Sequence, residues 1–183
     1  MITLYCRDNM KILQDVVIDK DLKTKAKVKK LSDMLLNEEV SLVDLIEVAK
    51  TLTGSDKGTC IEAIEFATTA KPELASLHCL KFVTQTLLDN APRVRWESAK
   101  IIGNIAHLYP KKLDKAVVNL LENSEFPGTV VRWSAAFALS EIAKLETTGN
   151  KDLIPAVEAI LRRETDVAIQ KIYLKALREV AAP

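Results

Sequence analysis

Apolar residues recur along most of this chain at the spacing of amphipathic helices. From Val94 to Ala106 they fall on one broad arc of a helix turning by about 100° per residue, with polar and aromatic residues on the opposite arc. Residues 131–143 and 169–181 repeat this pattern, and a shorter Leu-rich segment precedes each of the three. Asn, Ser, Asp and Pro mark the turns between the segments. The pattern therefore predicts successive pairs of short helices.

The repetition extends to individual residues. VRWESAKIIGNIA starts at Val94, VRWSAAFALSEIA at Val131 and IQKIYLKALREVA at Ile169, which gives offsets of 37 and 38 residues. GTCIEAIEFATTA, from Gly58 to Ala70, is a weaker copy placed 36 residues before the first. A single helix pair cannot bury its own apolar face, but stacked pairs share a continuous core. We therefore expect an all-α, α-α superhelix, a right-handed solenoid of about five two-helix repeats.

The period fades toward the N-terminus, although helices are still indicated there. Ser41 is a candidate N-cap with the acidic Asp44 at the third helical position, which predicts a helix running to about Leu52. Residues 22–36 carry apolar side chains at helical spacing, and residues 7–17 are a candidate for one more helix. Atypical first members are expected in a repeat array, because the outer face of a terminal unit meets water.

The second helix of each pair carries a family resemblance. V-R-x-x-A-A-x-A-L-x-x-I-A after a shorter Leu-rich helix resembles the second helix of a HEAT repeat, closest to the short, bacterial-type variety, and the match covers about residues 74–181. The resemblance implies that first helices lie on the convex side and that second helices line the concave side. We expect a single HEAT-like repeat domain over 1–183, with degenerate capping helices over 1–55 and clearer repeats over 56–183.

The resemblance also implies a ladder in which an Arg of each second helix meets an Asp at the preceding turn. Arg95 and Arg132 match that Arg, but the turns at Asn90 and Ser124 do not clearly supply the Asp. Gln170 replaces the Arg in the last repeat. The ladder is therefore expected to be incomplete.

The arc opposite the apolar residues is the candidate binding surface. Both tryptophans of the chain occupy one repeat position on it, and the helical wheel also places Gly103 and Ser140 there. Rigid aromatic side chains beside basic ones are typical of recognition surfaces. We define the predicted ridge as Trp96, Lys100, His107, Trp133, Phe137, Lys144, Lys171, Lys175 and Arg178. In the weak copy, the 36-residue offset gives Cys60, Ile64, Ala67 and Lys71 as the counterparts.

The alternative is that these aromatic side chains pack between neighbouring repeats. Charge separates the two interpretations only weakly, since the net charge is +1 and residues 41–90 and 91–183 carry net charges of −3 and +3. No global field points to nucleic acid or to a membrane. A non-enzymatic scaffold that binds a protein or peptide partner on its concave face is the interpretation we favour.

A nucleic-acid-binding protein related to the HEAT-like alkylpurine DNA glycosylases is the alternative function. Those enzymes hold DNA in the concave face, with tryptophans beside a catalytic Asp. One turn after the two tryptophans this chain has Lys100 and Phe137, which cannot stabilise a developing sugar cation. Glu97 and Glu141 are acidic and nearby, so the alternative stays open.

Catalytic and cofactor motifs are not found in the sequence. GSDKGT (Gly54 to Thr59) lacks the Lys that follows the second Gly of a phosphate loop and is better explained as a helix N-terminus. His78 and His107, the only histidines, accompany no nucleophile motif, and they are expected to be semi-buried and exposed, respectively. We expect no catalytic residues, no metal and no cofactor.

The remaining sequence features concern the cellular compartment of the protein. The three cysteines Cys6, Cys60 and Cys79 form no CxxC pair and are expected to be buried or idle thiols in a reducing compartment. No signal peptide is readable at the N-terminus, and no apolar run approaches the roughly 20 residues that span a bilayer. A cytoplasmic protein with no membrane association is expected, and the sequence does not indicate its oligomeric state.

Overall fold

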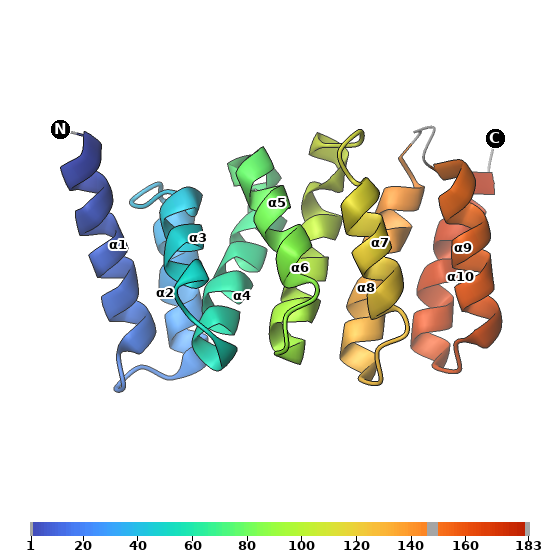
Figure 1. The fold of residues 1–183 in the computed structure, drawn as a ribbon, viewed down its shortest axis with the longest axis horizontal. Coiled ribbons are helices and arrows are strands. Elements are labelled where there is room, and N and C mark those ends of the chain that lie inside the picture. Colours follow the sequence, from blue (N-terminus) through green and yellow to red (C-terminus); the bar gives the residue numbers. More distant parts are fainter. Residues whose placement is uncertain (1, 146–149, 182–183) are drawn as a thin grey trace.

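The computed structural model describes residues 2–145 and 150–181, with side chains over 8–145 and 152–181. Within these ranges the chain is helical and contains no strand (Figure 1). The helices are α1 (Ile2–Ile18), α2 (Thr24–Leu36), α3 (Leu42–Lys50), α4 (Gly54–Ala70), α5 (Leu77–Thr86), α6 (Pro92–Ile105), α7 (Asp114–Asn123), α8 (Thr129–Ala143), α9 (Asn150–Arg163) and α10 (Val167–Ala181). Short 3₁₀ turns, η1 (Pro72–Leu74) and η2 (Ala106–Leu108), follow α4 and α6.

The helices form two layers that run along the length of the molecule. In Figure 1 the first helices α1, α3, α5, α7 and α9 lie nearer the viewer, and the second helices α2, α4, α6, α8 and α10 lie behind them. Successive second helices pack extensively on one another, whereas successive first helices touch only sparsely. Because the second helices pack on one another more closely than the first helices do, we infer that the solenoid curves toward the second-helix layer, and we refer to that layer as the concave face. The predicted all-α superhelix is confirmed.

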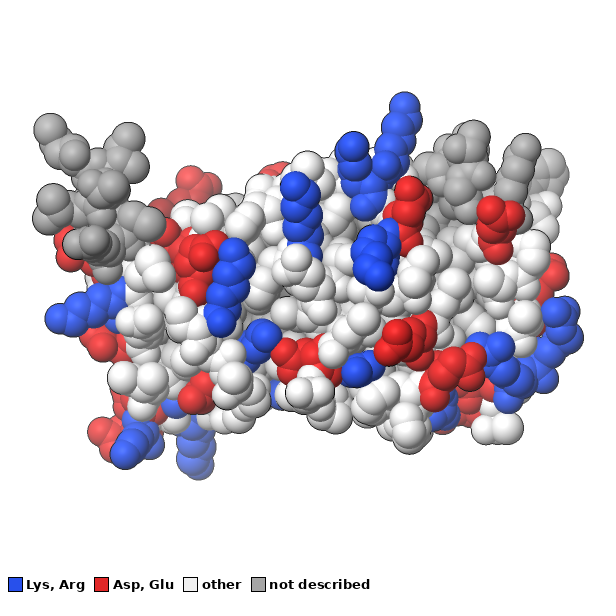
Figure 2. All heavy atoms as spheres, viewed as in Figure 1, with Lys and Arg blue, Asp and Glu red and all other residues white. Residues whose placement is uncertain are grey.

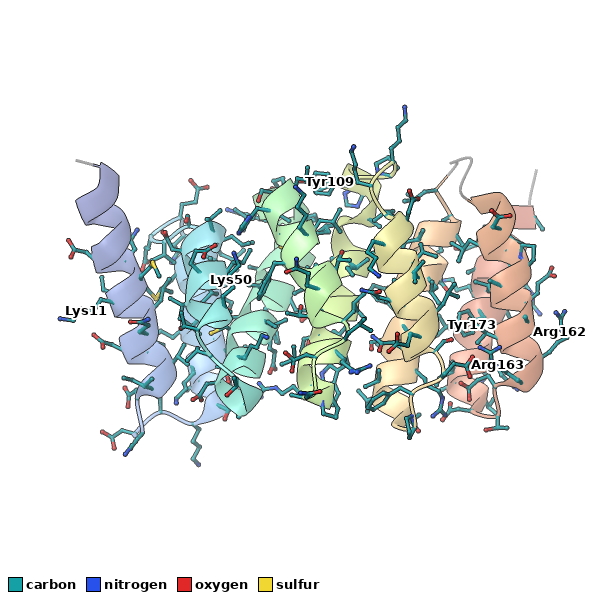
Figure 3. All side chains as sticks on the ribbon, viewed as in Figure 1. Lys11, Lys50, Tyr109, Arg162, Arg163 and Tyr173 are labelled. Atoms are coloured by element: carbon teal, nitrogen blue, oxygen red, sulfur yellow. The ribbon has the colours of Figure 1, made fainter. Side chains whose placement is uncertain are left out.

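The core lies between the two layers and continues from repeat to repeat. Leu13 of α1, Leu45 of α3, Ile102 of α6 and Leu139 of α8 are all completely buried within it. Tyr173 of α10 is also buried, inside the last helix pair (Figure 3), and its hydroxyl has no hydrogen-bond partner among the described residues. Burial raises the pKa of that hydroxyl above its usual value. Because the apolar surface is shared between neighbours, no pair has a separate core.

All three predicted N-terminal helices are present as α1, α2 and α3. The N-cap of α3 is a complete capping box: the Ser41 hydroxyl accepts a hydrogen bond from the Asp44 N–H at 3.0 Å, and the Asp44 carboxylate accepts one from the Ser41 N–H at 3.4 Å. Gly54 to Thr59 form the first turns of α4, as the sequence predicted for GSDKGT. These caps fix where the helices start, because they satisfy backbone donors that have no partner inside the helix.

Replacing Ser41 with alanine is expected to lower the free energy of unfolding by about 1 kcal/mol, because the Asp44 N–H loses its acceptor. Urea unfolding followed by circular dichroism measures this change. Ser76 caps α5 through a longer bond of 3.4 Å to the Cys79 N–H. Ser76→Ala is the matched control and should cost less. Equal losses in the two variants would contradict the capping argument.

The register predicted for the weak copy is wrong by two residues. Cys60, Ile64 and Ala67, predicted to face the ridge, are all completely buried. The pattern of buried positions along α4 matches that of α6 when the offset is 38 residues, and then Lys57 corresponds to Arg95. With this offset Phe66, which is 53% exposed, takes the position of Asn104 on the concave face. The corrected offset makes the repeat length of the last four pairs nearly constant.

Candidate partner-binding surface

The predicted ridge residues all lie on the second-helix layer, within or directly after α6, α8 and α10. Their exposure differs considerably. His107, Trp133, Lys144, Lys171, Lys175 and Arg178 are exposed, and Trp96, Lys100 and Phe137 are half-buried. The ridge therefore combines side chains open to a partner with side chains already engaged by neighbouring repeats.

Trp133 and Phe137 form an aromatic pair on α8. Their ring centroids are 6.2 Å apart and the rings are nearly parallel, at 11°. Phe137 rests against Gly103 of α6 so closely that a Cβ built on that glycine would lie 2.4 Å from the ring. Trp133 is 40% exposed and covers the outer side of Phe137. Phe137 thus packs between neighbouring repeats, which agrees with the alternative interpretation of the aromatic residues. Trp133, in contrast, presents apolar surface to solvent.

Trp96 belongs to a buried polar network rather than to an open aromatic surface. Its indole N–H donates to the Glu97 carboxylate at 2.7 Å, and Lys100 bridges Glu97 at 3.1 Å and Glu65 of α4 at 3.0 Å. Both carboxylates are more than nine-tenths buried. Burial raises the pKa of Glu97 above its usual value, and the attraction of Lys100 only partly offsets this. Burial by itself would lower the pKa of Lys100, but the two carboxylates raise it above its ordinary value.

The basic residues toward the C-terminal end are held to different degrees. Lys144 pairs with Glu141 at 2.7 Å and with Glu179 of α10 at 3.1 Å. Lys175 is 75% exposed and reaches Glu179 at 3.7 Å. For Lys171 and Arg178 no carboxylate of the described residues lies within ion-pair distance. Lys100 and Lys144 are thus each neutralised by two carboxylates, and positive charge remains mainly on α10.

The helical wheel placed two residues on the wrong face, and two residues of the concave face were not predicted. Gly103 and Ser140, predicted to lie on the exposed arc, are buried. Arg178 stands at the same repeat position, so it lies toward the outer edge of α10 rather than in line with Trp133. Phe66 and Glu62 of α4 were missed because the weak copy was aligned two residues out of register. Glu62 accepts a hydrogen bond from Arg93 of α6.

A row of cross-repeat contacts runs along the edge where each second helix begins. Lys57 reaches Asp89 at 2.7 Å, Arg95 reaches the Asn123 amide oxygen at 2.9 Å, and Arg132 reaches the Glu164 carboxylate at 2.9 Å. Each of these partners lies in the following repeat, at or next to the turn between its first and second helices. None of the three is an Arg–Asp pair, so the Arg–Asp ladder is incomplete, as expected, and Lys–Asp, Arg–Asn and Arg–Glu contacts join the repeats instead.

The same arginines also form hydrogen bonds within their own repeat, to the turn that precedes the second helix. Arg95 donates to the Asp89 carbonyl at 2.6 Å, and Arg132 donates to the Phe126 carbonyl at 3.2 Å, in both cases six residues earlier. Gln170 keeps this local bond, donating to the Glu164 carbonyl at 2.6 Å. Gln170 is neutral, but it makes the same hydrogen bond within its own repeat as the two arginines do.

Other candidate chemistry lies outside this surface. Cys60 and Cys79 are buried free thiols, and burial raises the pKa of each to about 12, while the Cys6 side chain lies outside the described residues. His78 is exposed rather than semi-buried, 3.1 Å from Glu47 across α3 and α5. Among the described side chains no group of three or more His, Cys, Asp or Glu could hold a metal ion. No described helix is long and apolar enough to cross a bilayer.

Comparisons with known proteins show the fold. The chain is similar to a designed armadillo repeat protein, YIII(Dq)4CqI, with a TM-score of 0.73 at 18% identity, over 94% of this chain and 80% of that one. It is also similar to the designed armadillo repeat protein YIII(Dq.V1)4CPAF in complex with the peptide (KR)4, with a TM-score of 0.70 at 18% identity and the same coverage. No family model and no curated protein matches the sequence. The chain is therefore a helical-repeat solenoid.

Proposed function

We propose that this chain is a non-enzymatic, HEAT-like scaffold that binds a protein or peptide partner on its concave face. The observation that carries the proposal is Trp133, an exposed aromatic side chain that stacks on Phe137. Rigid aromatic surface gives contact area at a low entropic cost and is enriched where partners bind. A structural neighbour with the same architecture is described in complex with a peptide, which supports a peptide as the ligand class.

The electrostatics of the concave face favour a peptide over nucleic acid. A protein that binds along a phosphate backbone needs several basic side chains free to contact phosphates. Lys100 and Lys144 are each occupied by two carboxylates, so the free basic side chains of the ridge are confined to α10 at one end of the face. Glycosidase chemistry also lacks support, because the Glu97 carboxylate is buried and already bonded to Trp96 and Lys100.

Trp133→Ala is expected to abolish partner capture while leaving the fold intact. The contact of Trp133 with its own chain is the stacking on Phe137, and hot-spot tryptophans contribute about 2 kcal/mol or more, roughly a thirty-fold loss of affinity. Affinity capture from native lysate, followed by titration of each recovered protein in purified form, measures the effect. Circular dichroism on the same samples reports the helix content.

The matched control is Val118→Ala on α7. Val118 is 58% exposed on the first-helix layer, so it should not contact a partner of the concave face. Retained binding in Val118→Ala together with lost binding in Trp133→Ala supports the proposal. If Trp133→Ala binds as well as the unaltered chain, or unfolds, the tryptophan has a packing role and the proposal is wrong.

A further inference from the structure

The carboxylates of the concave face are already satisfied by the chain's own basic residues. Glu62 is paired with Arg93, and Glu65 and Glu97 are both paired with Lys100 and buried. Glu141 is paired with Lys144. A basic ligand would have to displace these intramolecular partners, and two of the carboxylates lie too deep for solvent to reach. The N-terminal and central parts of this face therefore offer little to a basic peptide.

The basic side chains of α10 are in the opposite situation. Lys171 has no carboxylate of the described residues within ion-pair distance, and the Lys175 pair with Glu179 is long, exposed and shared with Lys144. Such an exposed pair contributes little and is readily exchanged for a ligand carboxylate. Arg178 adds a third basic side chain on the outer edge of the same helix. Positive charge is thus available at one end of the concave face.

These basic residues lie beside the exposed aromatic pair. Lys171 takes the repeat position of Trp133, and Lys175 takes that of Phe137, on the next helix of the layer. Because α8 and α10 pack directly on each other, each lysine lies one helix across from the corresponding ring. Packed helices are about 8–10 Å apart, and an extended peptide advances about 3.3 Å per residue. A peptide crossing the layer therefore moves from the rings to the lysines in about three residues.

We infer that the partner recognised here is an acidic peptide segment. An apolar side chain of the peptide lies on Trp133 and Phe137, and an Asp or Glu about three residues away lies over Lys171 and Lys175. The inference rests on the proposed function and adds the charge and the spacing of the ligand. Opposite charges on peptide and surface also speed the encounter and suppress basic competitors.

The test is a selection from a displayed library of random peptides of about twelve residues, long enough to cross four helices. The targets are the unaltered chain, the Trp133→Ala chain, the Lys171→Glu, Lys175→Glu variant, and a control variant with Lys81→Glu and Lys115→Glu. Lys81 and Lys115 are exposed on the first helices α5 and α7, a face on which acidic and basic side chains are interspersed (Figure 2). The two double variants carry the same change in net charge, so only its position differs.

Peptides enriched on the unaltered chain and on the control should carry Asp or Glu about three positions from an aromatic or aliphatic residue. The Lys171→Glu, Lys175→Glu variant should lose that preference. An enriched acidic peptide titrated by fluorescence anisotropy should bind this variant about tenfold more weakly at low salt, and the difference should shrink as salt is added.

The other outcomes separate the two proposals. Enrichment of neutral or basic peptides, or an acidic preference that survives the charge reversal, overturns the acidic-peptide inference and leaves peptide binding intact. Failure to enrich any peptide relative to the Trp133→Ala chain overturns both. A single-stranded oligonucleotide is titrated in the same way. If it binds more tightly than the selected peptides, and if this binding is lost in the Lys171→Glu, Lys175→Glu variant, the α10 surface binds nucleic acid and both proposals are wrong.

Discussion

Replacing Gly103 with leucine is expected to lower the free energy of unfolding by about 3 kcal/mol, at the upper end of the usual range for overpacked sites. A Cβ at this position would lie 2.4 Å from Cε1 and 2.8 Å from Cδ1 of Phe137. The ring cannot retreat without giving up its stacking on Trp133, and Gly103 lies in the last turn of α6, which η2 follows directly. Urea unfolding of the single variant measures the loss.

A double-mutant cycle with Phe137→Ala shows whether this clash is the cause. Once the ring is removed, Gly103→Leu should cost less than about 1 kcal/mol, since the added side chain enters the space that the ring left. In the same background Gly103→Ala should stabilise the chain by up to about 1 kcal/mol, because alanine favours a helix more than glycine does. If Gly103→Leu costs the same with and without Phe137, the contact between α6 and α8 is not what requires glycine.

The fold was predictable because the apolar arc repeats in register from one second helix to the next. The segments at Val94, Val131 and Ile169 became α6, α8 and α10. The weak copy was misaligned because small residues such as alanine fit two registers about equally well. Burial decides between the registers, since Cys60 and Ile64 face the core and Phe66 faces out. Residue identities alone do not indicate which neighbouring helix covers a side chain.

The candidate surface was less predictable, because the properties of its residues depend on other helices. A wheel drawn for α6 alone places Gly103 on the polar arc, whereas Phe137 of α8 covers it. The charge of the ridge was overestimated for the same reason. Lys100 is neutralised by Glu65 of α4, and Lys144 by Glu179 of α10. Trp133 remains the clearest candidate for partner contact, and the roles of the other ridge residues stay predictions.

Replacing Arg132 with methionine is expected to cost about 3 kcal/mol of unfolding free energy near neutral pH. The guanidinium of Arg132 donates to both carboxylate oxygens of Glu164, at 2.9 and 3.3 Å, and joins α8 to the corner of the last repeat. The Glu164 side chain is only 4% exposed. Removing the arginine leaves a buried carboxylate without its cation, which costs more than losing an exposed ion pair. Thermal unfolding or urea unfolding measures the difference.

The loss should be largest near neutral pH and smaller near pH 3. Burial by itself raises the pKa of Glu164, but hydrogen bonds from Arg132 and from the backbone N–H groups of Asp166 and Thr165 outweigh it, so the folded-state pKa lies below the ordinary value of 4.5. A carboxyl with a lowered folded pKa stabilises the protein above about pH 4.5, and that contribution disappears as the pH falls through the folded pKa. Arg95→Met is the matched control, because Arg95 meets the neutral amide of Asn123 at the equivalent contact and its ion pair with Glu122 is long, at 4.0 Å, and exposed. Its cost should be smaller and should vary less with pH. If the two variants show the same pH profile, the Glu164 charge does not stabilise the junction between α8 and the last repeat.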